Sequence, residues 1–184
     1  MNAYTGAMKL TPISERFILH WGEMGARWGV NRTVAQIHAL LYLSEHPLPA
    51  DEIAETLSVA RSNVSNSLKE LLSWRLVKVV HVMGDRRDHF DTSKDVWELF
   101  KLIVAGRKQR EVDPTLAVLC EFLASPELKK EAAGTRKRIE ETQQFIQVLT
   151  QWSDEMLRLE PETLMKVLKL GARIRGLVRR EAKT

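Results

Sequence analysis

Apolar side chains recur along the first half of the chain at intervals of three and four residues, which is the spacing of one helix face. The spacing predicts four helices, at residues 12–29, 33–46, 50–57 and 61–74. A tight link, Ser58-Val59-Ala60, separates the last two, which are short and carry their apolar positions on one side. The pattern therefore predicts a pair of short helices joined by a turn.

The first predicted helix combines large apolar residues with glycines. Its apolar stripe is Ile13, Phe17, Trp21, Met24 and Trp28. Gly22, Gly25 and Gly29 interrupt this helix, and each costs it up to about 1 kcal/mol relative to alanine. We expect another backbone or a ligand to approach the helix closely at these positions.

A short β-branched stretch follows the helix pair. Residues 76–82 and 87–91 are predicted strands, joined by a turn at Met83-Gly84-Asp85 in which Gly84 adopts a positive φ. Two short helices followed by a hairpin form the order of a winged helix-turn-helix.

Everything after Thr92 is predicted to be helical. Thr92 or Ser93 caps a helix that ends near Asp113-Pro114, and a second helix runs to Ala124. A long helix then extends from Pro126 to Leu159, and Leu164, Leu168, Ile174, Leu177 and Val178 line a final one. The predicted fold is mainly α with a small β-hairpin: a winged helix-turn-helix domain with an N-terminal helix at residues 1–112, and a helical dimerisation and regulatory region at residues 113–184. The apolar seam of the long helix needs a partner surface, so we expect a homodimer.

The charge distribution agrees with a polyanion partner for the middle of the chain. Residues 58–112 hold 11 basic and 7 acidic side chains, whereas residues 1–57 hold 4 basic and 6 acidic ones. A solvated basic face would produce the same imbalance. No apolar run is long enough for a membrane span, Met1–Thr11 lacks the apolar core of a signal peptide, and Cys120 is the single cysteine. These features predict a cytoplasmic protein.

The outer face of the second short helix carries the functional prediction. Opposite its leucines lie short hydrogen-bonding and basic side chains: Arg61, Ser62, Asn63, Ser65, Asn66 and Lys69. Asn pairs with adenine, Arg with guanine, and Ser with phosphates or several bases. Serine and asparagine are poor residues for a helix interior, which favours DNA recognition over a neutral surface.

The predicted hairpin continues this basic character. Arg86 and Arg87 follow its turn and are bracketed by Asp85 and Asp88. An arginine at a hairpin tip enters a narrow minor groove, where the negative potential attracts it, and the carboxylates would hold one guanidinium in place. The alternative is a surface ion-pair cluster of little energetic consequence.

Five sequence stretches resemble a known family. Residues 57–65 (LSVARSNVS) together with 84–88 (GDRRD) are similar to the DNA-binding core of MarR-type regulators, and residues 17–22 (FILHWG), 31–41 (NRTVAQIHALL) and 113–116 (DPTL) resemble its GbsR branch. The resemblance implies a homodimeric prokaryotic regulator, often a repressor, whose dimer interface uses helices from both ends of the chain. Ala60 departs from the serine that often begins the recognition helix of such proteins.

Other kinds of site find little support. The histidines at 20, 38, 46, 81 and 89 show no metal-ligand spacing, and no phosphate loop or catalytic motif occurs, so we expect no metal, no cofactor and no enzymatic activity. Phe17, Trp21 and Trp28 would form part of a cage for a cationic effector, although an aromatic stripe at this spacing also packs into cores or interfaces.

The sequence thus predicts a homodimeric, sequence-specific transcriptional regulator that binds a palindromic operator in double-stranded DNA. Repression and a response to a small-molecule effector are part of this expectation. The alternative is a winged-helix module that binds other proteins without reading DNA.

Overall fold

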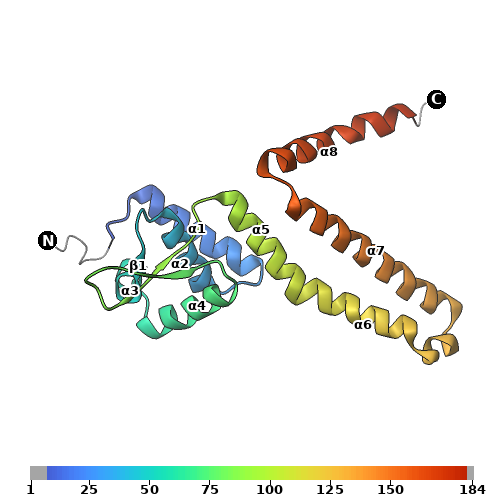
Figure 1. The fold of residues 1–184 in the computed structure, drawn as a ribbon, viewed down its shortest axis with the longest axis horizontal. Coiled ribbons are helices and arrows are strands. Elements are labelled where there is room, and N and C mark those ends of the chain that lie inside the picture. The colour runs from blue at the N-terminus through green and yellow to red at the C-terminus, as the bar shows by residue number, and fades with distance from the viewer. Residues whose placement is uncertain (1–7, 182–184) are drawn as a thin grey trace. The chain divides into compact units, whose positions relative to one another are not determined.

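The computed structural model describes residues 8–181 of the chain, with side chains through residue 171. Contacts within the chain divide it into two compact units, which meet in sequence between Ile103 and Val104. The first unit holds a helix-turn-helix and a small sheet, and the second holds helices (Figure 1). The boundary predicted between residues 112 and 113 separates a DNA-binding domain from a dimerisation and regulatory region. This functional division stays a prediction.

Two closely packed helices, α1 (Pro12–Arg27) and α2 (Arg32–Leu43), begin the first unit. The side chain of Thr11 caps α1. A Cβ at Gly25 would lie 2.6 Å from the Cβ of Ala35, and one at Gly22 would lie 2.7 Å from the Cγ of Gln36. The glycines therefore serve the close approach of α2, as the sequence suggested.

The buried side of α1 differs from the predicted stripe. Ile18, Gly22 and Gly25 are buried, whereas Ile13 and Trp28 are exposed. The side chains closest to α2 are the smallest ones because the short distance between the helices leaves no room for aromatic rings.

The helix-turn-helix consists of α3 (Ala50–Leu57) and α4 (Arg61–Ser73), within one residue of the predicted bounds. Ser58 adopts a left-handed conformation between them, with φ of 53°. α2 and α3 both pack on α4. Its inner side chains Val64, Leu68 and Leu71 are buried together with Ile37, Leu40 and Ile53 in one core.

The sheet has one strand more than expected. β2 (Lys78–His81) and β3 (Asp88–Asp91) form the predicted hairpin, and β1 (Leu48–Pro49) pairs with the other edge of β3 in the antiparallel order β1-β3-β2. The two prolines around Leu48 suggested only a break between helices. Proline is tolerated at an edge strand, and the buried Leu48 lies opposite Phe90.

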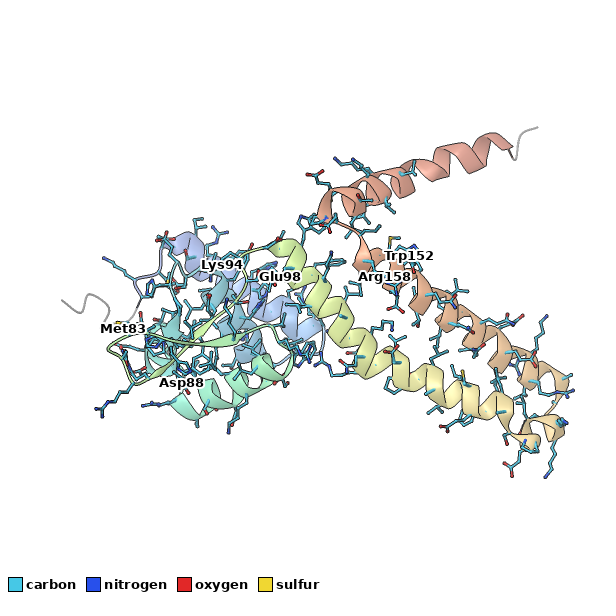
Figure 2. The ribbon with its side chains drawn as sticks, in the orientation of Figure 1. Met83, Asp88, Lys94, Glu98, Trp152 and Arg158 are labelled. Carbon is cyan, nitrogen blue, oxygen red and sulfur yellow. The ribbon has the colours of Figure 1, made fainter. Side chains whose placement is uncertain are left out.

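The segment between the sheet and α5 (Val96–Arg107) corrects the predicted cap. Thr92 is buried, and its hydroxyl donates to the carbonyl of Leu76 at 2.6 Å. The side chain of Asp95 caps the helix instead, accepting from the backbone N–H of Trp97 at 2.7 Å. Ser93 hydrogen-bonds to Glu98, which is labelled with Lys94 in Figure 2.

The second unit contains the end of α5, a π-helical turn η1 (Lys108–Val112), and α6 (Asp113–Ala124). α6 begins at Asp113 with Pro114 in its first turn and ends at Ala124, as predicted. The helical backbone is nevertheless not interrupted before it, because the wide π turn η1 leads directly into Pro114, which has no N–H to donate. Lys108 on this turn forms ion pairs with Asp113 at 2.9 Å and with Asp154 at 3.3 Å.

The rest of the second unit consists of a 3₁₀ helix η2 (Pro126–Lys130) and the helices α7 (Ala133–Arg158) and α8 (Pro161–Glu181). α7 therefore begins seven residues later than predicted, and it packs alongside α6. The side chains of Ile174, Leu177 and Val178 lie outside the described residues. The structure confirms the predicted fold class, a mainly helical winged helix-turn-helix.

Candidate nucleic-acid interface

The outer face of α4 presents a continuous row of polar and basic side chains to solvent. All six predicted contact residues on this helix are exposed: Arg61, Ser62, Asn63, Ser65, Asn66 and Lys69. No hydrogen bond or ion pair among the described residues involves their side chains. Their donors and acceptors are free to meet a partner.

The inner face of the same helix fixes its position. Val64 is fully buried, Leu68 and Leu71 are nearly so, and the hydroxyl-bearing Ser67 is also buried. The helix is therefore held by apolar contacts on one side while its polar side stays open. Ala60 provides no side-chain cap at the N-terminus of α4, so no N-cap side chain satisfies the first amides of this helix.

The loop between β2 and β3 forms the wing. Gly84 has the predicted positive φ, 85°, and the N–H of Asp85 donates to the carbonyl of Val82 at 3.1 Å. Met83 lies fully exposed in this loop, and Asp88 begins the returning strand (Figure 2). Arg86 is exposed on the loop, and among the described residues no hydrogen bond or ion pair engages its guanidinium.

Arg87 behaves differently from its neighbour. Its Nη2 donates to Asp85 Oδ2 at 2.6 Å, its Nε lies 3.0 Å from the same oxygen, and its Nη1 donates to Asp51 Oδ2 at 2.8 Å. Asp51 belongs to the first turn of α3. We call Arg87, Asp85 and Asp51 the wing clasp, because the arginine ties the wing to the helix-turn-helix.

The clasp stabilises the charged form of each of its members. Hydrogen bonds from Arg87 lower the pKa of Asp85 to about 2, and hydrogen bonds to Asp85 and Asp51 raise the pKa of Arg87. Partial burial alone would raise the pKa of Asp51, but the hydrogen bond and charge of Arg87 together with backbone hydrogen bonds outweigh it, and the pKa is lowered. His89 also contacts this group, with Nε2 3.5 Å from Asp85 Oδ2.

The pairing of Arg87 with Asp51 could not be read from the sequence. The carboxylates next to the arginine suggested that one guanidinium would be held, and Asp85 does hold Arg87. Asp51 lies 36 positions earlier in the chain, where its place in the first turn of a helix gave a sufficient local reason for an acidic residue. No periodicity or motif connects the two positions.

The aromatic residues proposed for an effector site are only partly brought together. Phe17 and Trp21 stack on each other, with ring centroids 5.3 Å apart and an interplanar angle of 19°. Both pack against the core of the first unit, whereas Trp28 is 62% exposed beyond the end of α1. Stacked rings cover one face of each other, so the geometry favours packing, and an effector site here stays a prediction.

Two further features of the described residues concern metal ions and membranes. Within the described part of the chain, no three histidine, cysteine or acidic residues lie close enough to hold a metal ion. No described helix combines the length and apolar character needed to cross a membrane.

The two helices, the turn and the hairpin define the first unit as a winged helix-turn-helix. Residues 28–88 match the model of the MarR family. The segment that contains α2, α3, α4 and the wing loop is therefore similar to the winged helix of the MarR family.

Two curated relatives and one solved structure are also similar to this chain. The chain is 22% identical over 86 residues to the putative HTH-type transcriptional regulator YvaV of Bacillus subtilis, covering 47% of this chain and 49% of the relative. It is 22% identical over 79 residues to the HTH-type transcriptional repressor OpcR of the same organism, covering 43% of each. The matches thus span less than half the length of these relatives.

The crystal structure of a transcriptional regulator superimposes with a TM-score of 0.63 at 16% identity, covering 79% of this chain and 96% of that one. This likeness extends beyond the segment matched by the MarR model and supports the fold of the chain.

Proposed function

We propose that this protein is a sequence-specific DNA-binding transcriptional regulator that acts as a homodimer on a palindromic operator. The observation that carries the proposal is the outer face of α4, where six polar or basic side chains are exposed above a fully buried apolar face. A recognition helix needs this combination, because it must be rigid while its side chains meet base edges in the major groove.

The two contact elements have different roles in this proposal. Asn66 and its neighbours on α4 read bases, and Arg86 on the wing reaches the minor groove or the adjacent backbone. Arg87 was predicted to contact DNA as well. Its contacts with Asp85 and Asp51 support a positioning role, in which it sets the place of the wing relative to α3.

The relatives support the further parts of the proposal. One of them is named a repressor, and repression is the outcome we propose here. We further propose that the protein belongs to the GbsR branch, on the residues that resemble it, and that it is cytoplasmic. An effector site near Phe17, Trp21 and Trp28 is also part of the hypothesis. The relatives are named as regulators rather than enzymes, and we propose no catalytic activity.

A selection of genomic fragments with competitor DNA at two salt concentrations tests the proposal. We expect a subset of fragments to survive competition at the higher salt concentration. Replacing Asn66 with Ala should reduce discrimination between the selected site and mismatched sites by about 1–3 kcal/mol. Arg86→Ala should instead weaken binding to all sequences. The slope of the logarithm of affinity against the logarithm of salt concentration should become smaller by about one, which corresponds to one phosphate contact.

Lys130→Ala is a matched control, because it removes one positive charge from an exposed residue of η2 in the second unit. This variant should leave both the discrimination between sites and the salt dependence of binding unchanged. A folded protein that binds no DNA at low salt would favour the protein-interaction alternative. Binding without sequence preference would indicate a packaging role.

A further inference from the structure

The helix α7 has buried polar residues on the side that packs against α6 and exposed apolar residues on the opposite side. An ordinary surface helix shows the reverse distribution. The side that packs against α6 includes Gln143 and Thr150, both only 9% exposed. The side-chain amide of Gln143 donates to the Sγ of Cys120 on α6 at 3.7 Å. Polar side chains thus take part in the contact between α6 and α7, next to the partly buried Ile139, Ile146 and Leu157 on the same side of the helix.

The other side of α7 carries an apolar stripe, which we define as Phe145, Val148, Leu149 and Trp152. Their exposed fractions are 68%, 64%, 42% and 54%. Phe145 follows Gln143 by two residues and Trp152 follows Thr150 by two, which turns each about 200° around the helix axis. The stripe therefore points away from α6, and Figure 2 marks Trp152 on it.

We propose that the apolar stripe binds the same stripe of a second copy of this chain, with the two α7 helices antiparallel across a two-fold axis near Val148 and Leu149. This inference rests on the proposed function, which requires a dimer, and it assigns the surface and the orientation. An isologous contact of this kind places Phe145 of one copy near Trp152 of the other.

The charges along α7 favour the antiparallel orientation. Residues 133–139 contain three basic side chains and no acidic one, whereas the last five residues of α7, 154–158, contain two acidic side chains and one basic one, and Glu160 and Glu162 follow the end of the helix. An antiparallel pair brings the basic end of each helix beside the acidic end of the other. A parallel pair would place like charges together, which lowers the stability of a complex.

The size of the stripe also fits a self-association surface. Monomeric proteins rarely expose contiguous apolar patches beyond a few hundred Å². An aromatic side chain buries 150–250 Å², so the exposed parts of Phe145 and Trp152 alone amount to roughly 200 Å². Two copies of the whole stripe with its charged flanks approach the total of about 1,000 Å² that a specific interface needs.

Chemical cross-linking in the full-length protein tests the surface and the orientation together. In a Cys120→Ser background, Val148→Cys lies near the proposed axis and should form a covalent dimer with a short bis-maleimide. Gln151→Cys, which lies beside the stripe, is the control and should cross-link far less. A dimeric protein in which Val148→Cys gives no cross-link would overturn the proposed surface.

Two further variants report the orientation. Thr142→Cys and Glu155→Cys are exposed and lie 13 residues apart, about 20 Å along the helix. In the antiparallel pair neither should cross-link to itself, but the two co-expressed with different tags should give a covalent heterodimer. Self-linking of each variant without the mixed product would show a parallel pair and would overturn the proposal.

Sedimentation of Trp152→Glu compared with Gln151→Glu separates this inference from the proposed function. We expect Trp152→Glu to sediment as a monomer at micromolar concentration with unchanged helicity, and to lose at least tenfold in affinity for a palindromic site. Gln151→Glu should stay dimeric. If Trp152→Glu remains dimeric and binds the site normally, the function stands and the α7 contact is wrong.

Discussion

The two units of the chain bury their apolar side chains to very different extents. In the first unit, Ile37, Leu40, Leu41, Leu48, Ile53 and Val64 are fully buried. In the described part of the second unit, Leu164 is the one hydrophobic side chain that is buried, while several aromatic and aliphatic side chains of α6, α7 and α8 are exposed.

The difference shows what each unit needs in order to be complete. The first unit buries a core of large apolar groups by itself, and burying such a side chain contributes about 1.5–3 kcal/mol. Ile13, Trp28 and Met83 stay exposed in this unit, and the outer face of α4 is polar. The second unit leaves comparable apolar groups in water, which is expected of helices that become fully covered only when a partner binds.

Truncating a core side chain gives the largest expected contrast between the units. Ile53→Ala should lower the free energy of unfolding by about 2–5 kcal/mol, because Ile53 is fully buried and the cavity will not collapse completely. Val148→Ala in α7 should change it by less than about 0.5 kcal/mol in dilute protein. Urea unfolding measures both. Equal losses in the two variants would remove the distinction between the units.

Acid should weaken the first unit through a buried histidine. Burial and the nearby charge of Lys94 lower the pKa of His38 to about 4, and its Nε2 lies 3.3 Å from the hydroxyl of Thr92. The unfolded chain, with a histidine pKa of about 6.5, binds the proton more readily between pH 6.5 and 4. The free energy of unfolding should therefore fall across that window, by up to about 3 kcal/mol.

The measurement is the difference in stability between the wild type and His38→Gln as a function of pH. The difference should change between pH 6.5 and 4 and stay constant above this window. His20→Gln alters an exposed histidine of α1 and should show no such change. A pH-independent difference for His38→Gln would contradict the assignment.

The glycines of the two units should respond in opposite directions to substitution by alanine. Gly25→Ala places a Cβ 2.6 Å from that of Ala35, so α1 and α2 must separate, and we expect a loss of about 1–3 kcal/mol. At Gly134 in α7 no atom lies within 4 Å of the added Cβ. Gly134→Ala should stabilise the helix by up to about 1 kcal/mol. Thermal unfolding compares the two variants.

The smallest effect concerns the ion pairs of the second unit. Lys108→Met removes the contacts with Asp113 and Asp154, whose side chains are 42% and 44% exposed. Solvent screens such pairs, so the loss should be at most about 1 kcal/mol. Adding 0.5 M salt should reduce the difference between wild type and variant. A much larger, salt-independent loss would mean that this unit depends on polar contacts.

Local features of the fold were accessible from the sequence. The bounds of α3 and α4, the wing turn at Gly84 and the buried face of α4 followed from periodicity and turn chemistry, because each depends on residues a few positions apart. The exposure of the six polar or basic residues on the outer face of α4 followed for the same reason, and their contact with DNA stays a prediction. The segment matched by the MarR model includes all of these features.

Other features depended on residues far apart in the chain. The strand β1 exists because Leu48 meets Phe90, and Arg87 is held because Asp51 lies beside it in space. The buried side of α1 shifted by one position because α2 approaches so closely that only glycines fit between them. Helix periodicity cannot report such distances.

The sequence by itself determined that this protein has a helix-turn-helix with a polar outer face, because short-range spacing specifies which side of a helix is apolar. The tertiary structure decided which apolar sides are covered. α2 and α4 bury theirs and α1 buries Ile18 beside its glycines, while α7 packs on α6 and leaves Phe145, Val148 and Trp152 exposed. Both kinds of helix show the same periodicity, and only the presence or absence of a neighbour in space distinguishes them.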